Sequence, residues 1–444
     1  MLLGAVHAGL FALASLRSKS PMLPAFEVTA AFWICFGVVA ILALRFFPSH
    51  TDESGDKVGK VGFEKLIHPM ASVRTLSVLL VISAIGLMLH MYSKYALTEI
   101  RPVSCLFDIR FAWQEVPHKL QPFAVRLSSM AGHVLTHMAL PSLIISGWAL
   151  SSNICAPASR PALLGFFISS ISIGLIYAGF LGSRNAMLTF LITSAFGVIL
   201  GLCSKTLSRK SIVRAMALCL VPAILGGMFA TAVFSDRMFC ESSSVSAEER
   251  SIGYLKGFED EIPVEVVDPV PGTLKYWVLN ACPICNPAIL YLNHGMLNLA
   301  QVIDTDLRGQ PVLAQKIWWV VKRLGLSELE QDDMTPVSRV YGKGGLPLAG
   351  SAYHDFGWAG MFGLASLFGL LVGFSLRGLF RSRIEAGVSL VILTCSFYIL
   401  SMSYMFTATG VMFFPFLLFS TVVVFGLIPL LQRSKSYKPR NRND

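Results

Sequence analysis

The chain has 444 residues, of which 54% are hydrophobic and only 14% are charged, with a net charge of +10. A soluble domain carries about 25% charged residues and could not cover its surface with so few. The composition therefore excludes an ordinary water-soluble protein. Because the positive charge is divided among short loops between apolar blocks, it indicates contact with anionic lipid rather than with nucleic acid.

About ten apolar blocks are long enough to cross the hydrocarbon core of a bilayer. Backbone polar groups in lipid must be satisfied within the segment, and these blocks do not alternate in polarity as barrel strands do, so each is predicted to be a helix. In chain order, the predicted spans are Leu2–Leu16, Ala25–Phe47, Thr75–Ala96, Leu127–Leu150, Ala162–Leu181, Asn185–Cys203, Ile212–Phe234, Phe356–Phe380, Ala386–Phe406 and Gly410–Leu431. The first block resembles a signal-peptide core, but no positive region precedes it and no cleavage site is clear, so we expect a retained span.

The positively charged loops predict the orientation of the spans. The chain after the last span is basic, and so are the loops at residues 49–74, 205–214 and 381–383, which we therefore place on the cytoplasmic side together with both termini. Arg17 and Lys19 fall in a predicted outer loop and oppose this assignment.

The spans divide the chain into four predicted parts. With about seven spans expected before the long loop, the parts are an N-terminal membrane bundle at residues 1–234, a large loop on the non-cytoplasmic side at 235–354, a C-terminal membrane bundle at 355–431 and a basic cytoplasmic tail at 432–444.

The large loop differs from the rest of the chain in charge. Residues 236–354 contain 10 basic and 15 acidic side chains, a net charge of −5, whereas the remaining residues have a net charge of +15. Two helices are predicted in the loop, at Asn286–Asp304 and at Leu313–Leu326. The second is amphipathic and too short to span, so we expect it to lie on the membrane or over a cavity.

Arg184 is the charged residue whose position is most informative about function. It lies between two apolar blocks that are joined only by Gly182 and Ser183, near the outer membrane surface. A guanidinium there is costly to bury without a partner, and the first turn of a helix favours an anion. Arg184 is therefore a candidate for binding the diphosphate of a lipid-linked substrate. The alternative is a snorkelling arginine among lipid head groups.

A glycine-rich, basic segment from Arg339 to Gly360 leads directly into a predicted span. It lacks the spacing of a P-loop, but its glycines would allow the backbone to approach a ligand closely. His354 and Asp355 lie at the membrane boundary, where either could accept a proton from a sugar hydroxyl, or Asp355 could orient His354. The alternatives are an interfacial histidine bonded to backbone and an aspartate that caps the following helix.

Three weaker patterns do not support a metal or redox site. His133 and His137 have a metal-compatible spacing but lack a third ligand, so a polar contact between helices is the preferred interpretation. Asp304–Asp306 matches a pattern that holds metal in many glycosyltransferases, yet such pairs are common in acidic loops. Cys282–Cys285 has CxxC spacing without a surrounding redox fold. No metal is predicted.

Three motifs, taken in order, resemble those of Wzy-type oligosaccharide repeat-unit (O-antigen) polymerases. They are GSRNA at Gly182–Ala186, YLNHGMLNL at Tyr291–Leu299 and GSAYHDFGWAG at Gly350–Gly360. Each motif is weak alone, but their order, their spacing and the topology match, and the similarity covers residues 160–380.

The resemblance implies a GT-C-like membrane glycosyltransferase at the periplasmic face of the bacterial inner membrane. Its substrates would be undecaprenyl-diphosphate-linked oligosaccharides, and it would move the growing glycan onto a new lipid-linked unit to build a surface polysaccharide. No cofactor is implied. Membrane lipids and a chain-length regulator protein are the other expected partners, and nucleic acid is not one.

The candidate site residues follow from this chemistry. Departure of a lipid diphosphate places negative charge on phosphate oxygens, so fixed cations are needed. The predicted diphosphate- and sugar-binding residues are Arg184, Arg339, Lys343, Tyr341, Tyr353 and Arg308. The acceptor hydroxyl needs a base, for which His354 or Asp355 is the prediction, with His294 in reserve. The long loop would cover the site and exclude water.

Two other functions stay open. A glycan ligase would use similar chemistry with a different acceptor. A lipid-linked oligosaccharide flippase or transporter would place charged residues near the bilayer midplane, often in repeated halves. The interiors of the predicted spans carry few charges and show no repeat, which favours the polymerase.

Overall fold

The structure is a computed structural model that describes residues 16–46, 61–98, 122–152, 157–181, 184–203, 209–239, 255–256, 264–267, 270–274, 276–277, 285–305, 346–405 and 413–428. Its elements are helices apart from one small two-stranded sheet. By contact, the chain divides into two units. Unit 1 comprises Met1–Leu42, Phe234–Leu370 and Ile399–Met412, and unit 2 comprises Ala43–Val233, Leu371–Tyr398 and Phe413–Asp444.

Within the described residues, 8 helical segments are long and apolar enough to cross a membrane, so the chain is a polytopic α-helical membrane protein. They are formed by α2 (Leu23–Phe46), α4 (Val73–Thr98), the pair α6 (Phe123–Thr136) and α7 (Ala139–Ser151), α8 (Arg160–Leu181), α9 (Arg184–Cys203), α10 (Arg209–Phe239), α16 (Leu348–Gly378) and α17 (Arg383–Met405). A further apolar helix, α18 (Phe414–Thr421), continues as a π-helix, η5 (Val422–Leu427), and is shorter.

The predicted spans from Ala25–Phe47 to Ala386–Phe406 coincide with these eight segments. Of the last predicted span, Gly410–Leu431, the structure describes residues 413–428, which form the shorter apolar helix α18–η5. The predicted span Leu2–Leu16 lies outside the described residues, except that Leu16 begins a strand. The predicted span at Phe356 begins earlier, because α16 already starts at Leu348. The total of about ten spans and the GT-C-like arrangement stay predictions.

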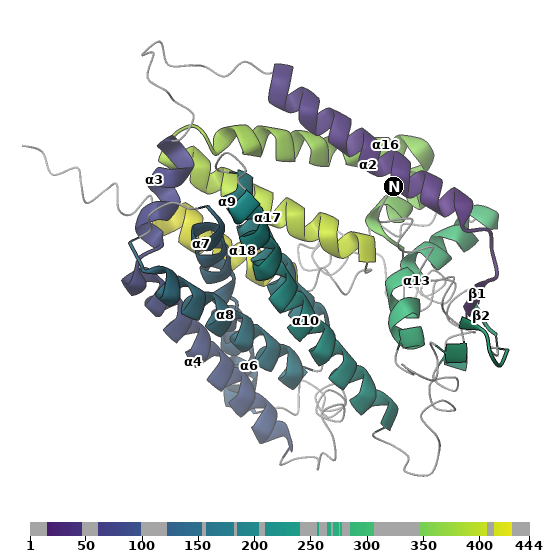
Figure 1. The fold of residues 1–444 in the computed structure, drawn as a ribbon, viewed down its shortest axis with the longest axis horizontal. Helices are drawn as coiled ribbons and strands as arrows, with labels where there is room; N and C mark the ends of the chain where they lie inside the picture. The colour runs from purple at the N-terminus through teal and green to yellow at the C-terminus, as the bar shows by residue number, and fades with distance from the viewer. Residues whose placement is uncertain are drawn as a thin grey trace, which may run out of the picture. The chain divides into compact units, whose positions relative to one another are not determined.

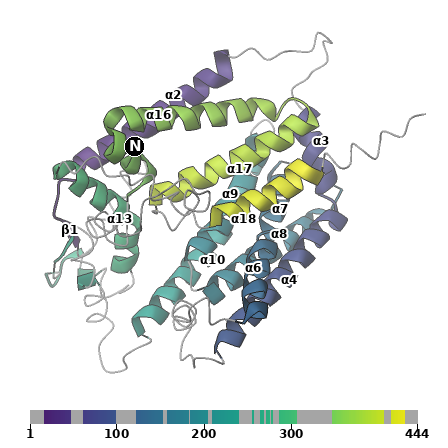
Figure 2. The ribbon, with the colours of Figure 1, turned by 180° about the vertical axis from the view of Figure 1, so that it is seen from behind.

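The pair α6–α7 forms the core of unit 2. Every residue of α7 is buried, including Trp148, whose ring meets Phe63 edge-on. Helix α7 contacts α8 and α9, while α6 contacts α4, and Figures 1 and 2 show α4, α6 and α8 side by side. A polar segment predicted as a loop also contributes a helix, α3 (Val61–Met70), whose Leu66 and Ile67 are buried.

A proline divides the predicted single span into α6 and α7. Pro141 lacks an N–H group and cannot bond to the carbonyl of His137 as an uninterrupted helix would require. The chain bends at His137 and Met138, and the His137 carbonyl accepts instead from the Leu140 N–H at 3.0 Å. Ring stacking of His137 on Phe416 of α18, with centroids 5.1 Å apart, packs this bend inside unit 2.

Helices α4 and α6 cross closely because glycines face the partner backbone. A Cβ added to Gly86 would lie 2.3 Å from the Thr136 nitrogen, and one added to Gly132 would lie 2.7 Å from the His90 nitrogen. Small residues allow this close approach in membrane helices. The crossing brings the histidines of the two helices next to each other.

In unit 1, α2 packs against α16. Phe32 of α2 shares an apolar cluster with Met361 and Ala365 of α16. A Cβ on Gly369 would lie 2.8 Å from the carbonyl oxygen of Phe36, so the two backbones approach closely there. Figure 1 shows the two helices side by side along this stretch.

Helix α13 (Cys285–Asp304) confirms the first helix predicted in the large loop. One of its sides packs through Met296 and Leu299 into the cluster with α2 and α16. Another packs through Leu290 and Leu297 against the small sheet, in which β1 (Leu16–Ser18) pairs antiparallel with β2 (Val264–Val266). The second predicted loop helix, Leu313–Leu326, lies outside the described residues.

Candidate functional site

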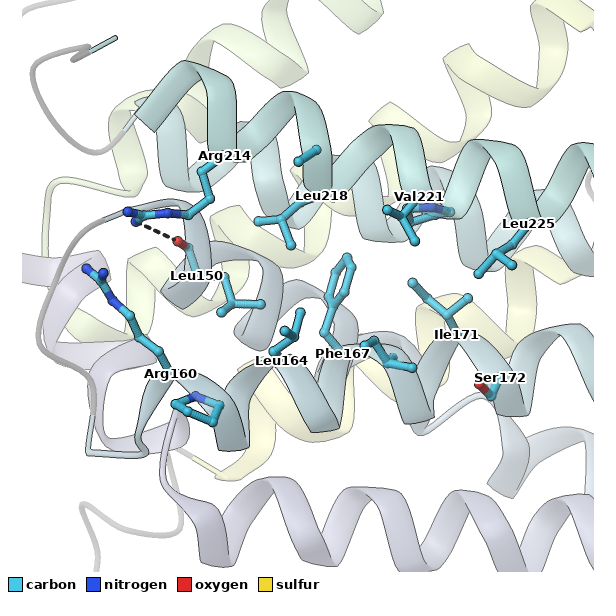
Figure 3. A pocket seen from close by; sticks show the side chains of 14 residues that line it. Leu150, Arg160, Leu164, Phe167, Ile171, Ser172, Arg214, Leu218, Val221 and Leu225 are labelled. Carbon is cyan, nitrogen blue, oxygen red and sulfur yellow. Dashed lines mark hydrogen bonds between the residues drawn. The ribbon is translucent and has the colours of Figure 1, made fainter. Parts of the chain in front are cut away.

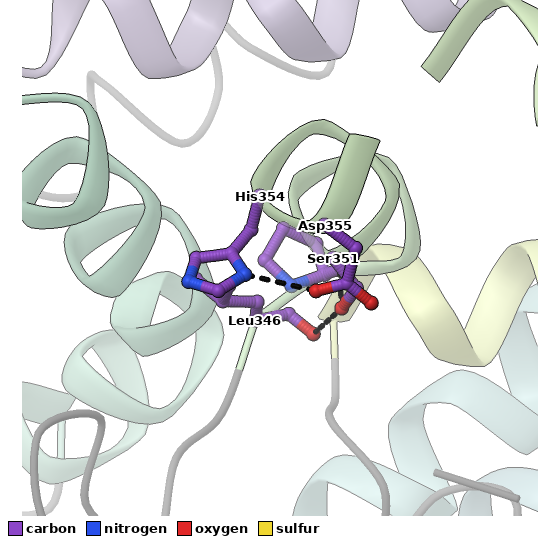
Figure 4. A network of polar contacts seen from close by, with 5 residues as sticks. Leu346, Ser351, His354 and Asp355 are labelled. Atoms are coloured by element: carbon purple, nitrogen blue, oxygen red, sulfur yellow. Dashed lines mark hydrogen bonds and ion pairs between the residues drawn. The ribbon is translucent and has the colours of Figure 1, made fainter. Parts of the chain in front are cut away.

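The first turns of α16 hold a buried histidine–aspartate pair. His354 Nδ1–H donates to Asp355 Oδ1 at 2.9 Å, and the two side chains are only 1% and 5% exposed. Figure 4 shows the ring and the carboxylate turned toward each other beside Ser351. Adjacent residues on a helix do not normally face each other, so both side chains must bend toward their neighbour. A carboxylate bonded to Nδ1–H fixes the ring orientation and tautomer, as in sites where histidine acts as a base.

Local bonds secure the start of this helix. Ser351 Oγ donates to the carbonyls of Pro347 at 3.0 Å and Leu346 at 3.5 Å. These bonds occupy carbonyls at the first turn, just before the His354–Asp355 pair. Since α16 begins at Leu348, Asp355 lies within the first segment of this helix, close to the segment that follows it.

A break at Gly357 separates the pair from the long part of α16. Gly357 has φ 63° and ψ −154°, a conformation that is essentially restricted to glycine. The helix changes direction there, two positions beyond Asp355. His354 and Asp355 therefore sit in a short helical segment that leads into the membrane-spanning segment.

Helix α13 lies against the same segment. The Pro347 ring would be 3.4 Å from a Cβ on Gly295, and Leu299 would be 3.1 Å from a Cβ on Gly350. Among the α13 side chains that the structure describes, three polar ones are buried: His294 at 5% exposure, and Asn293 and Asn298 at 0%. Asn293 Nδ2 donates to the Ile289 carbonyl at 2.9 Å. Burial of so many polar groups is costly unless they have partners, so unit 1 contains a polar centre built from α13 and α16.

Four predicted site residues lie in this part of unit 1. His354 and Asp355 form the pair, and His294 is buried on α13. Tyr353 is buried in the apolar cluster, and its ring meets Trp358 edge-on with centroids 5.4 Å apart. The described contacts therefore include packing of Tyr353 beside the pair, and its predicted role in binding stays a prediction.

The predicted cations are described less fully. Arg184 is the first residue of α9 in unit 2, which agrees with its predicted place in the first turn of a helix. The other four predicted binding residues, Arg308, Arg339, Tyr341 and Lys343, lie outside the described residues.

Unit 2 contains a second polar centre that the sequence only partly indicated. His133 Nδ1 bonds to the Tyr177 hydroxyl of α8, so the predicted polar contact between helices is present. His90 of α4 lies with its ring centroid 4.7 Å from that of His133. His137 completes the group, with its Nδ1–H donating to the His133 carbonyl at 2.6 Å.

The sequence of α4 contains a pattern that could have indicated this polar centre. His90 and Lys94 are four residues apart, on one face of an otherwise apolar span, and both are buried. Among the described residues, neither ring nitrogen of His90 has a hydrogen-bond partner. A count of charges in the spans does not include neutral histidines, so this face was missed at the sequence level.

Among the residues that the structure describes, no group of three or more His, Cys, Asp or Glu side chains is arranged to hold a metal ion. Two of the histidines already use Nδ1 in other bonds, His133 to Tyr177 and His137 to backbone. Asp304 is exposed at the end of α13. No protein-family model, curated protein or solved structure matches the chain.

Proposed function

We propose that the chain is a membrane glycosyltransferase that joins undecaprenyl-diphosphate-linked oligosaccharide repeat units into a surface polysaccharide. The reaction would take place at the non-cytoplasmic face of the bacterial inner membrane. The observation that carries the proposal is the buried His354–Asp355 pair at the head of a membrane-spanning helix. The pair lies within the third motif that resembles the repeat-unit polymerases.

The pair suits the base required by glycosyl transfer. With Nδ1–H held by Asp355, the lone pair of the neutral ring is on Nε2. Nε2 would accept the proton of the acceptor hydroxyl while its oxygen forms a bond to the anomeric carbon. The bond from that carbon to the diphosphate breaks, and its electron pair leaves with the diphosphate. Asp355 stabilises the imidazolium that results.

The leaving diphosphate needs positive charge that is fixed in advance. Arg184, Arg339 and Lys343 are the proposed sources of this charge. Buried amides on α13, Asn293 and Asn298, would supply hydrogen bonds to sugar hydroxyls near the pair.

The test measures chain extension by purified protein in proteoliposomes supplied with lipid-linked repeat units. His354→Ala should lower the rate by about 10²–10⁴-fold, the usual contribution of a positioned general base. Asp355→Asn should lower the rate as well, because an amide cannot stabilise the imidazolium. The matched controls are His68→Ala and Asp304→Asn, which change exposed residues of the same types.

Three outcomes separate the alternatives. Near-normal extension by His354→Ala, in protein that elutes as wild type on size exclusion, would contradict the role of the pair. Near-normal extension by Arg184→Ala would remove that arginine from the mechanism. Wild-type protein that transfers glycan only to another acceptor would indicate a ligase.

A specific observation favours a transporter as the second candidate. Ionisable residues inside membrane helices commonly mark substrate or proton pathways. Unit 2 buries His90, Lys94, His133 and His137 within spanning helices. A transporter predicts that His90→Ala slows movement of a fluorescent lipid-linked oligosaccharide across the bilayer while His354→Ala does not. The polymerase proposal predicts no such movement by wild-type protein.

A further inference from the structure

A groove lies between α8 and α10 in unit 2. Its volume is about 630 Å³, within the range of sites that bind small ligands. Most of its lining is apolar, with Leu164, Phe167 and Ile171 from α8 facing Leu218 and Val221 from α10. Figure 3 shows these side chains on the two walls.

Side chains from α8 and α10 meet beyond one end of the groove. A Cβ on Gly179 would lie 3.4 Å from the Phe229 ring, so this side chain of α10 reaches α8 there. The opposite end of the groove lies toward the first residues of both helices, where Leu150 and Pro161 are part of the lining. We call this end of the groove its mouth.

Both charged residues that line the groove lie at this mouth. Arg160 is the first residue of α8, and Arg214 lies in the first turns of α10. Arg214 Nη1–H donates to the Leu150 carbonyl at 3.4 Å, and Figure 3 shows both guanidinium groups at the same end of the groove. Among the described residues that line it, none is acidic. A guanidinium presents a planar fork of donors that matches a phosphate, so the mouth is complementary to an anion.

The dimensions match one leaflet of a bilayer. The α8 wall runs from Arg160 to Ser172, which corresponds to about 18 Å of helix at 1.5 Å per residue. One leaflet contributes about half of the roughly 30 Å hydrocarbon core. The arginines stand at the first residues of predicted spans, at the depth of the head groups, and the apolar walls extend into the depth of the chains.

We propose that this groove binds one anionic phospholipid, with the phosphate between Arg160 and Arg214 and an acyl chain along the walls. Basic pockets between membrane helices on the cytoplasmic side bind anionic head groups in this way. The starts of α8 and α10 share one side of the membrane, because α9 returns the chain between them. That side carries the basic residues 205–214, and the positive-inside rule makes it cytoplasmic. The shape and charge of the groove carry this inference, and only the choice of a phospholipid over the carrier lipid rests on the proposed function.

The orientation argues against the carrier lipid as occupant. A lipid-linked oligosaccharide that reacts at the other face would have its diphosphate at the opposite ends of these helices, near Arg184. The mouth at Arg160 and Arg214 instead faces the leaflet where anionic phospholipids meet the basic loops. A peptide would need hydrogen-bonding groups along the walls, and those walls are apolar.

The experiment measures lipid retention by native mass spectrometry of the full chain. Wild-type protein in detergent is equilibrated with equal amounts of dioleoyl-phosphatidylglycerol and dioleoyl-phosphatidylcholine, which have the same acyl chains. We expect wild type to retain phosphatidylglycerol preferentially. The double variant Arg160→Gln/Arg214→Gln should lower that preference by about tenfold or more, because each cation near the membrane surface contributes to binding an anionic lipid.

Two matched controls accompany the test. Arg74→Gln removes an exposed arginine at the start of α4, a span of the same unit that does not line the groove. Ile168→Trp should fill the groove and reduce retention, whereas Ile176→Trp should not, although both isoleucines lie on α8 with similar exposures of 48% and 46%. The tryptophan pair keeps the test decisive if the double arginine variant fails to fold.

Each outcome decides the proposal. Equal retention of the two phospholipids by wild type, or an unchanged preference in both the double variant and Ile168→Trp, would overturn it. Preferential displacement of phosphatidylglycerol by undecaprenyl phosphate at equal concentration would also overturn it and assign the groove to the carrier lipid. A preference that falls in the double variant and in Ile168→Trp but persists in both controls supports it.

Discussion

Tyr177 is fully buried in unit 2, where its hydroxyl bonds to His133 and its ring touches His137. A hydroxyl in such surroundings would be costly without a partner, so the bond determines which way both side chains point. The His90 ring packs at a tilt against Tyr177 and His133, with centroid distances of 4.9 Å and 4.7 Å. The tyrosine thus joins α4, α6 and α8 through one side chain.

Loss of this hydroxyl tests the contribution of the polar centre. Tyr177→Phe leaves His133 Nδ1 buried without its partner, so we expect the free energy of unfolding to fall by about 1–3 kcal/mol. The matched control is Tyr92→Phe on α4, where the side chain is 53% exposed. Thermal unfolding in detergent is the measurement, and equal midpoints for the two variants would contradict the prediction.

At the scale of elements, the break in α16 matters most for the candidate site. An uninterrupted helix would carry His354 and Asp355 straight into the long spanning segment. Gly357 instead separates a short segment, which packs on α13, from the segment that packs on α2. The pair is therefore held by both packing and a change of helix direction.

Substitution of this glycine tests the break. Gly357→Ala places a side chain at φ 63°, which should cost about 1–3 kcal/mol of stability. We also expect slower chain extension, because the pair would shift relative to α13. Gly363→Ala on the same helix is the control, since nothing lies within 4 Å of its added Cβ and its φ is not positive. The prediction is wrong if both variants unfold at the same temperature and extend chains equally well.

At the scale of the whole molecule, the two contact-defined units are discontinuous along the chain. Residues of α16 and α17 belong to both units, and α2 is grouped with segments more than 190 residues later. The four contiguous parts predicted from the sequence describe location in or out of the membrane. The units describe packing, which long-range contacts determine.

Orientation is the whole-molecule property that the charge pattern predicts. We expect green fluorescent protein fused to the C-terminus to fluoresce and alkaline phosphatase fused there to be inactive, because the tail at residues 432–444 is basic. An epitope inserted at the exposed turn of Val270 and Gly272 should bind antibody in spheroplasts without permeabilisation. An active phosphatase fusion, or an epitope reached only after permeabilisation, would reverse the orientation.

The membrane helices could be predicted from the sequence alone, because each depends on a property of one continuous segment. A block such as Ala162–Leu181 is apolar over its whole length, and in lipid only a helix satisfies its backbone. The helix at Asn286–Asp304 could be predicted from its own segment in the same way. A contact between His354 and Asp355 could also be predicted locally, because the two residues are adjacent in the chain. The order of the three motifs suggested the polymerase function, and that order can be read without knowing how the helices pack.

Contacts between side chains of different helices could not be predicted in this way, because they depend on how the helices pack. Gly86 and Gly132 let α4 and α6 approach, and that approach places His90 beside His133 although they are distant in sequence. The groove at Arg160 likewise depends on side chains of α7, α8 and α10, which come from different segments of the sequence. Such features depend on the distance between helices, which is set by packing of side chains from many segments and is not encoded in any single one.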